Sequence, residues 1–381
     1  MDNIEYLEIR DINREIIGIL DVFQSVIWET DYYGTGSFEV YATASPKNLS
    51  LLKIDNYVSR IDDDNIGVIE KIYVEYDDQN GDMIVASGRF GKSLLDRRLI
   101  YNISGSVAGK VNILPTTSKG LVEVAARELV NNNIINSIYP ARNVDFIILG
   151  ALQGIDKIIV DEDGDAAEKQ TSYGNLLEYT DSMLQEYNLG AYMMFDRLTK
   201  ELCYTVINGD DRSRNNIVGN NPIIFSQDFD NLLNSSYSRE TINLKNTALI
   251  GGEGEGSERF CAMIGVNATG LDRREVWVDA KSQSKKYKDE SGADKEYTDE
   301  EYLSLLKSAG TQQISLLQIT EAYQGNVNIN NYRYKYRKNF NIGDIVSIED
   351  HKLNIYMNAR ILKIVECQNE EGYSINLEYG N

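Results

Sequence analysis

An Asn-Gly pair between two alternating runs constrains the fold of this chain most. Residues 66–76 alternate between apolar and polar side chains, and residues 83–90 form a second apolar run. Asn80-Gly81 stands between them, and this dipeptide favours the tight turns whose twist matches that of paired antiparallel strands. The sequence therefore predicts a β-hairpin over residues 66–90.

The rest of the first hundred residues also has a strand-like pattern. Segments 4–9 and 37–43 alternate, and segment 15–28 is apolar and ends in Trp28. Tyr is abundant, at 25 residues against nine Phe, and its ring suits half-buried strand faces and wet interfaces. We expect these segments to be strands of the same β region as the hairpin.

Two amphipathic segments predict helices in the middle of the chain. Ser118 can cap a helix with apolar residues at helical spacing as far as Val130. Ser172 can cap a second helix that ends before Gly190. A hairpin over 191–207 and an Asn-rich loop over 208–222 are expected to follow.

The last part of the chain returns to strands around a helical segment. Residues 223–280 read as short strands, and the charged segment 281–297 as an exposed excursion. Thr298 and Glu301 form a capping-box pattern at the start of a helix. Gly310 is expected to interrupt that helix, with a second helix over 311–323, and strands are expected from residue 327 onward.

The net charge opposes nucleic-acid binding. Lys and Arg total 38 against 59 Asp and Glu, a formal charge of −21. Such a chain repels phosphate at long range and should not hold nucleic acid by counterion release, although the acids could also serve only to keep the surface hydrated. A hydrophobic fraction of 42% and a charged fraction of 25% are ordinary for a folded protein.

The cysteines and the apolar runs exclude several further classes. Cys203, Cys261 and Cys367 are odd in number and far apart, which argues against a disulfide framework and a thiolate zinc site. The acidic start at Met1 does not resemble a signal peptide. No apolar run approaches the roughly 20 residues that span a membrane. We expect a chain that folds in the cytoplasm and does not insert into a membrane.

Two glycine motifs resemble phosphate-binding loops without matching them. Gly91-Lys92-Ser93 lacks the required earlier glycine, because position 86 is Ala. The loop Gly251-Gly-Glu-Gly-Glu-Gly256 carries two carboxylates that would repel a phosphate. We interpret the first as a loop or helix start and the second as a mobile loop between strands.

No catalytic residue, cofactor site or metal site is expected. The acidic segment 161–165 lacks the Gly and Glu of a calcium loop at the required places, so it reads as a solvated loop that could at most bind a cation adventitiously. His351 is the single histidine and lies in a predicted turn. A Ser or Cys nucleophile would need this one residue as its base. Carboxylate pairs for glycoside cleavage stay open, but nothing singles one out.

Four stretches in order along the chain resemble the tail-hub proteins of long-tailed phages and related tail-like particles. They are Trp28-Glu-Thr-Asp-Tyr-Tyr33 through Val40; Val68 through Arg98 with its Asn-Gly hairpin; Tyr173-Gly-Asn-Leu-Leu177; and Ile342-Gly-Asp344 through Glu366. The resemblance implies a homotrimer at the tip of the tail tube, in which two similar β-barrel-like domains per subunit imitate the six-fold tube above. It also implies a place in the virion tail beside the tail tube or distal tail protein, the tape-measure protein, and tip, fibre or spike proteins.

Together these observations predict an α+β, mainly β chain. We expect a first β-barrel-like domain over 1–100, a mixed α/β domain over 101–225, and a second β-barrel-like domain over 226–280 plus 324–381, with a helical excursion over 281–323. The expected function is a structural tail hub that is not an enzyme. A cell-wall hydrolase and a glycan-binding protein are the alternatives, and a cell-wall zymogram and a glycan-binding assay would separate them from the hub.

Overall fold

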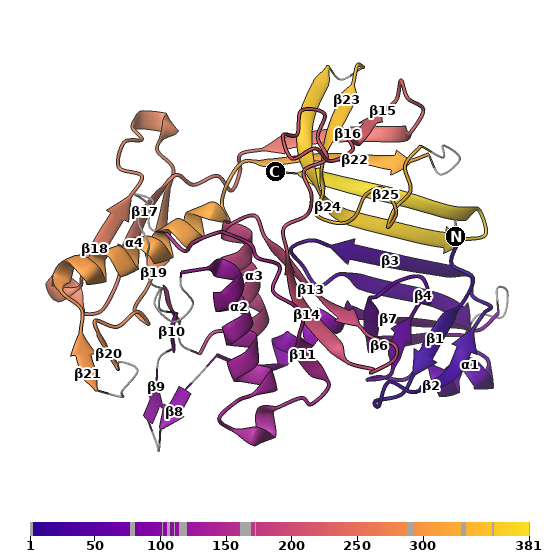
Figure 1. Cartoon of the computed structure of the whole chain (residues 1–381), viewed down its shortest axis with the longest axis horizontal. Coiled ribbons are helices and arrows are strands. Elements are labelled where there is room, and N and C mark those ends of the chain that lie inside the picture. The colour runs from indigo at the N-terminus through magenta and orange to yellow at the C-terminus, as the bar shows by residue number, and fades with distance from the viewer. Residues whose placement is uncertain are drawn as a thin grey trace.

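The computed structural model describes most of the chain. The described residues are 3–76, 81–100, 102–104, 107–109, 111–113, 120–160, 169–171, 173–288, 293–328, 333–352 and 354–380. Two β regions lie one above the other, with helices α2 (Val122–Val130) and α3 (Leu176–Glu186) beside them and a further small sheet with helix α4 (Asp299–Ser315) at the far side (Figure 1). Among the described residues, no helix combines the length and the apolar character needed to cross a bilayer.

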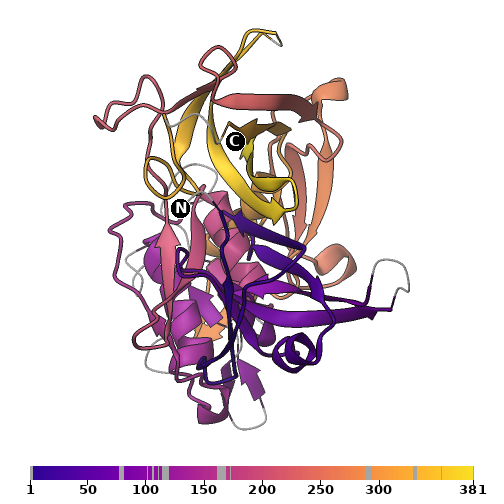
Figure 2. The ribbon, with the colours of Figure 1, turned by 90° about the vertical axis from the view of Figure 1, so that its right-hand side faces the viewer.

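The first β region comes from the N-terminal part of the chain. Alternating burial along β3 and β4 places one face of each strand in the core, which the alternation of residues 37–43 predicts for β4. The predicted hairpin is confirmed as β6–β7, which extends from the side of the molecule (Figure 2), while its turn residues 77–80 lie outside the described part. Its elements are β1 (Leu7–Arg10), β2 (Ile16–Leu20), β3 (Ser25–Asp31), β4 (Ser37–Thr43), α1 (Pro46–Leu51), β5 (Tyr57–Ser59), β6 (Ile66–Glu75) and β7 (Met83–Phe90).

The middle region is mixed. Helices α2 and α3 pack on the three-stranded sheet β11-β14-β13 around one buried apolar core. The elements are a 3-10 helix (Gly91–Arg97), β8 (Asn102–Ser104), β9 (Val107–Gly109), β10 (Val111–Ile113), α2 (Val122–Val130), a π-helical turn (Asn131–Ile135), a 3-10 turn (Pro140–Arg142), β11 (Ile147–Leu149), β12 (Lys169–Thr171), α3 (Leu176–Glu186), β13 (Gly190–Phe195) and β14 (Leu202–Ile207).

Both predicted helices exist, but their predicted caps are wrong. Asn175 is the N-cap of α3, and its side chain accepts a hydrogen bond from the Glu178 amide. Helix α2 starts after Leu121 without a side-chain cap. Ser118 and Ser172 lie outside the described residues. Both helices begin where the apolar pattern starts, at Val122 and Leu176, and therefore later than a cap at Ser118 or Ser172 would place them.

A small sheet and the longest helix form a core of their own. Strands β17 (Thr247–Gly251), β18 (Cys261–Ile264) and β19 (Glu275–Asp279) are covered by α4 (Asp299–Ser315), next to the hairpin of β20 (Lys286–Lys288) and β21 (Asp294–Glu296). The capping box of Thr298 and Glu301 is confirmed. The expected break at Gly310 is wrong: a Cβ there would lie 2.7 Å from Ile250 Cδ1, so the glycine lets α4 approach the sheet closely.

The second β region follows α4 and includes two strands that precede the small sheet. The second helix expected over 311–323 is wrong, because the chain leaves α4 after Ser315 and enters β22 at Thr320. Its strands are β15 (Ile224–Ser226), β16 (Leu232–Glu240), β22 (Thr320–Val327), β23 (Ile345–Asp350), β24 (Ile355–Asn369) and β25 (Gly372–Gly380).

The two β regions form one continuous sheet. Its main path runs β16-β22-β25-β24-β3-β4-β7-β6-β5-β1-β2, and the antiparallel pair β24–β3 joins the two regions. The expected mainly β, α+β class is confirmed. The expected barrels are not: within the described residues the strands make an open sheet and no closed barrel. Where one domain ends and the next begins stays a prediction.

The two β regions also repeat one strand order. It is β3-β4-β7-β6-β5 in the first region and β16-β22-β25-β24-β23 in the second, with antiparallel pairing between all neighbours. The long strands even share a bulge, between Ile69 and Lys71 in β6 and between Ile361 and Lys363 in β24. The repeat ends at the next strand, because β1 pairs with β5 antiparallel whereas β15 pairs with β23 parallel.

Candidate functional site

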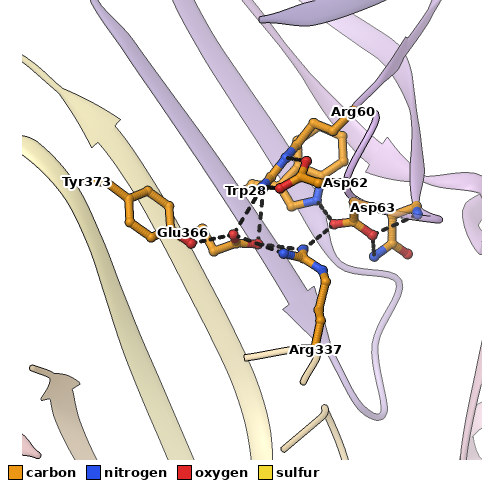
Figure 3. A network of polar contacts seen from close by, with 8 residues as sticks. Trp28, Arg60, Asp62, Asp63, Arg337, Glu366 and Tyr373 are labelled. Carbon is orange, nitrogen blue, oxygen red and sulfur yellow. Dashed lines mark hydrogen bonds and ion pairs between the residues drawn. The ribbon is translucent and has the colours of Figure 1, made fainter. Parts of the chain in front are cut away.

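Buried polar side chains gather where the two β regions meet. Strand β24 pairs with β3 from Lys363 opposite Asp31 to Gln368 opposite Val26, which places Glu366 opposite Trp28. Figure 3 shows how charged side chains from both regions point toward one another at this seam. We call the set Trp28, Arg60, Asp62, Asp63, Arg337, Glu366 and Tyr373 the junction network.

The centre of the junction network is a buried ion pair. Arg60 donates from Nη1 to Glu366 Oε2 and from Nη2 to Glu366 Oε1, both at 3.1 Å, and each side chain is 1% exposed. Asp62 accepts two further hydrogen bonds from Arg60, at 3.0 and 2.7 Å. Such a fork-to-carboxylate pairing fixes geometry as well as charge, so it holds β24 at one position against the first region.

A second arginine, Arg337, also binds acidic side chains of both β regions. Arg337 donates to Glu366 Oε2 at 2.7 Å and to Asp63 Oδ2 at 2.6 Å. Trp28 Nε1 donates to the same Asp63 oxygen at 2.6 Å, and the Tyr373 hydroxyl donates to Glu366 Oε1 at 2.5 Å. Arg337 has φ 62°, a left-handed conformation that the surrounding contacts must hold in place.

The electrostatics explain why these charges stay ionised in the interior. Burial alone would raise the pKa of Glu366, but Arg60 and Arg337 outweigh it and lower that pKa below its ordinary value. Burial would lower the pKa of Arg60, but Glu366 and Asp62 raise it above its ordinary value. Each charge is therefore stabilised by a partner from another segment of the chain. Removing one partner would leave the remaining buried charges less well compensated, which destabilises the fold.

Tyr32 marks a second meeting point, where both β regions touch the mixed region. Its buried hydroxyl donates to the Ile207 carbonyl at 3.0 Å and lies 3.2 Å from the Asn188 carbonyl, while Arg360 stacks 4.9 Å above its ring. Burial raises the pKa of Tyr32 to about 12. A Cβ at Gly343, which has φ +86°, would lie 2.3 Å from the Tyr32 ring, so only glycine allows this packing.

A polar cavity of about 830 Å³ lies between these contacts. Its wall combines residues of both β regions and of the mixed region, and it is rich in carboxylates. Neither histidine nor cysteine is among the lining residues, so the cavity offers no His- or Cys-based pair of nucleophile and base. Across the described part of the chain, no group of three His, Cys, Asp or Glu side chains is placed to hold a metal ion.

The first glycine motif is structural. Gly91-Lys92-Ser93 starts a 3-10 helix, and Lys92 is 2% exposed. Its ammonium donates to the Tyr33 carbonyl at 2.9 Å and to Asp181 Oδ1 at 3.0 Å, and burial raises the pKa of Asp181. The helix-start interpretation holds, and this lysine anchors the mixed region to the first β region instead of facing a phosphate.

The other sequence candidates lie away from the junction network. Residues 251–256 end β17 and lead into a short 3-10 turn before β18, as expected for a connection between strands. His351 lies in the turn between β23 and β24, where its Nδ1 is 2.6 Å from Asp228 Oδ2 with both side chains about half exposed. The acidic segment 161–165 lies outside the described residues. Cys203, Cys261 and Cys367 are free thiols.

The stretches that carry the tail-hub resemblance partly converge on this seam. Trp28 and Tyr32 come from the first stretch, and Gly343, Arg360 and Glu366 come from the last. Sequence reasoning missed Arg60, Asp63 and Arg337. A buried Arg is rare enough to be a signal in principle, but nothing local in the sequence shows that these side chains are buried.

Comparisons with known proteins agree on one class. The sequence profile of the siphovirus ReqiPepy6 Gp37-like protein family matches residues 6–381. No curated protein matches the chain in sequence.

Among solved structures, the 43 kDa tail protein of prophage MuSo2 from Shewanella oneidensis is similar in fold, with a TM-score of 0.54 at 12% identity over 98% of each chain. The tail protein from Neisseria meningitidis MC58 has a TM-score of 0.52 at 11% identity, over 99% of this chain and 96% of the other. Since the family profile spans nearly the whole sequence, the chain is a component of the virion tail and belongs to the siphovirus ReqiPepy6 Gp37-like family of phage tail proteins.

Proposed function

We propose that this tail protein is a structural hub. Three copies form a ring at the tip of the tail tube, close the tube, adapt it to the tip or baseplate, and let DNA pass. Its neighbours would be the tail tube or distal tail protein, the tape-measure protein, and tip, fibre or spike proteins. The role is structural rather than catalytic.

The observation that carries this proposal is the repeat within the sheet. Each chain holds two units of the same strand order, joined edge to edge through β24 and β3. Three chains would therefore present six such units, which matches the six-fold tube that a hub must meet. The junction network supports the same role, because buried bidentate ion pairs hold the two units in one fixed arrangement.

We expect light scattering of the chain alone to give three times its 43.1 kDa mass. If the chain trimerises only on its partner, we expect three copies of it in the complex that forms after mixing with tail-tube protein. A closed ring needs the same contact at each boundary, so intermediate dimers should be scarce at equilibrium. Negative-stain images of the same sample should show three-fold rings. A strict monomer that persists within assembled tails would contradict the proposal.

We also expect the wall of the ring to be neutral or negative. A net charge of −21 per chain leaves the ring strongly acidic, and duplex DNA carries about one charge per 1.7 Å of its axis. Fluorescence anisotropy should therefore detect no duplex binding near physiological salt, where repulsion acts over about 8–10 Å. A lumen lined by clustered Lys and Arg in a map of the assembled ring, or tight salt-sensitive DNA binding, would contradict this expectation.

A further inference from the structure

Several strand edges of the continuous sheet, those of β2, β6 and β16 among them, have no partner strand in the described structure, and the edges of β6 and β16 correspond to edges that are covered elsewhere in the chain. Strand β16 pairs with β22 on one side and with no described strand on the other. Strand β6 pairs with β5 only from Ile66 to Val68, so its edge from Lys71 to Glu75 has no described partner strand beyond β7. Open edges present unpaired N–H and C=O groups and invite another strand.

The repeat shows what belongs on these edges. In the second unit, β24 pairs with β23 over Ile355–Arg360 and then with β3 over Lys363–Gln368. Strand β6 corresponds to β24, and its second half is open where β24 is covered by β3. Strand β16 corresponds to β3, and its outer edge is open where β3 is covered by β24.

We propose that β6 of one subunit pairs antiparallel with β16 of the next copy of this chain, and that this contact closes the ring. The interface repeats between chains the β24–β3 pairing that each chain already makes within itself. The contact is head-to-tail, because one subunit contributes its β6 edge and the next copy contributes its β16 edge, as a ring requires. The inference rests on the proposed ring and adds the strands, the register and the residues that form it.

The shared bulge sets one side of the register. Because the bulges of β6 and β24 coincide, Lys71 corresponds to Lys363 and Tyr73 to Val365. Within the chain, Lys363 faces Asp31 and Val365 faces Glu29.

The pairing to the next strand sets the other side. Trp28 faces Phe38 on β4, and Tyr237 faces Tyr323 on β22. Phe38 and Tyr323 occupy equivalent positions in the two units. Phe38 pairs with Gly88, which pairs with Ile69 just before the bulge of β6. Tyr323 pairs with Tyr379, which pairs with Ile361 just before the bulge of β24. Asp31 therefore corresponds to Glu240 and Glu29 to Ser238, so Lys71 should face Glu240, and Tyr73 should face Ser238, of the next copy.

The charges on the two edges fit this register. Lys363 Nζ lies 3.3 Å from Asp31 Oδ2, and the same signs recur as Lys71 and Glu240. Lys71 and Glu240 are both exposed in the single chain. On the other face, partly buried Val74 would meet Tyr237, which is 37% exposed. Opposite charges and apolar pairs directly across antiparallel strands each stabilise the contact.

Disulfide trapping tests the strands and the register together. In a background with Cys203→Ala, Cys261→Ser and Cys367→Ala, the variant Tyr73→Cys/Ser238→Cys should oxidise to covalent trimers on a non-reducing gel. Residues directly opposite in antiparallel strands have Cα atoms about 4.5–5.5 Å apart, within the range that a disulfide spans. The matched control Tyr73→Cys/Arg239→Cys shifts the pairing by one residue, which turns the two thiols to opposite faces, so it should give few covalent trimers.

Charge reversal provides a test that needs no covalent bond. Lys71→Glu and Glu240→Lys should each weaken subunit association by roughly fivefold, since an exposed pair is replaced by like charges. The double variant Lys71→Glu/Glu240→Lys should restore association to near the level of the unchanged chain. Both single variants lie on exposed strand edges, so circular dichroism should show unchanged folding.

The outcomes separate this interface from the ring itself. The Tyr73→Cys/Ser238→Cys variant could form trimers by light scattering and yet give no cross-link between subunits. That result would overturn the β6–β16 interface and leave the hub proposal standing. A cross-link within a single chain would also overturn it, because the sheet would then close on itself. The absence of trimers both alone and with tail-tube protein would overturn the interface and the proposed ring together.

Discussion

Replacement of Glu366 by Ala is expected to lower the free energy of unfolding by about 3–5 kcal/mol. The carboxylate is 1% exposed and accepts hydrogen bonds from both Arg60 and Arg337, so its loss removes the bidentate partner of the equally buried Arg60 and leaves that arginine with Asp62 alone. Guanidinium denaturation followed by Trp28 fluorescence, in a Trp277→Phe background, reports on this seam because the indole is part of the network.

A matched control removes a more exposed acid of the same seam. Glu29 contacts Lys363 at 3.4 Å and its side chain is 30% exposed, so Glu29→Ala should cost less than about 1 kcal/mol. Equal effects for the two variants would mean that burial of the network contributes nothing. The same comparison has a pH dependence: because the pKa of folded Glu366 is lowered, its stabilisation is full above the unfolded pKa near 4.3 and is lost as the pH falls through the folded pKa. Glu366→Gln should flatten that acid limb.

Replacement of Tyr32 by Ala should cost about 3–5 kcal/mol, the range for large aromatic residues removed from a core. The ring is fully buried, fills the space that Gly343 leaves, and carries the hydroxyl contacts to the mixed region. Tyr32→Phe should lose about 1 kcal/mol, because it removes only the hydroxyl. Hydrogen exchange should speed up in β13 and β14 in the Ala variant.

The control for this experiment is a tyrosine of the same sheet whose side chain is exposed. Tyr356 lies on β24 and is 61% exposed, so Tyr356→Ala should leave the denaturation midpoint nearly unchanged. If Tyr32→Ala were as mild as Tyr356→Ala, the contact between the three parts of the chain would not depend on this ring. Exchange that increases only in β3 would likewise contradict a role in holding the mixed region.

Local features of the fold could be predicted from the sequence. The β6–β7 hairpin and the capping box of α4 are coded by side chains within a few residues of one another. Errors arose where tertiary contacts decided the outcome. Gly310 reads as a helix break, yet it lies within α4 because Ile250 packs against it. Strand β5 has three residues and no pattern of its own, and it exists because β1 and β6 pair with it on either side.

The junction was not predicted from the sequence. Trp28 and Glu366 lie in stretches that carry the tail-hub resemblance, but nothing in those stretches shows that the two residues meet. Arg60 bonds to a residue 306 positions away and has no local mark. The repeat was hidden for a similar reason. Phe38 and Tyr323 occupy the same place, as do Val40 and Gly325, so the two units share pairing geometry while their side chains differ.

The pairing of β3 with β24 has a consequence for synthesis of the chain. Glu29 meets Lys363, 334 residues later, so β3 leaves the ribosome long before the strand that covers it. Until residues 363–368 emerge, the nascent first unit carries an open edge of the kind that β16 presents in the finished chain. Pairing over such a separation is slow, and exposed edges in unfinished chains are prone to misassembly. A chain that terminates early would therefore leave the edge of β3 uncovered. That edge would compete with β16 for pairing with β6 of complete subunits. Truncated products should therefore inhibit ring assembly at low proportions.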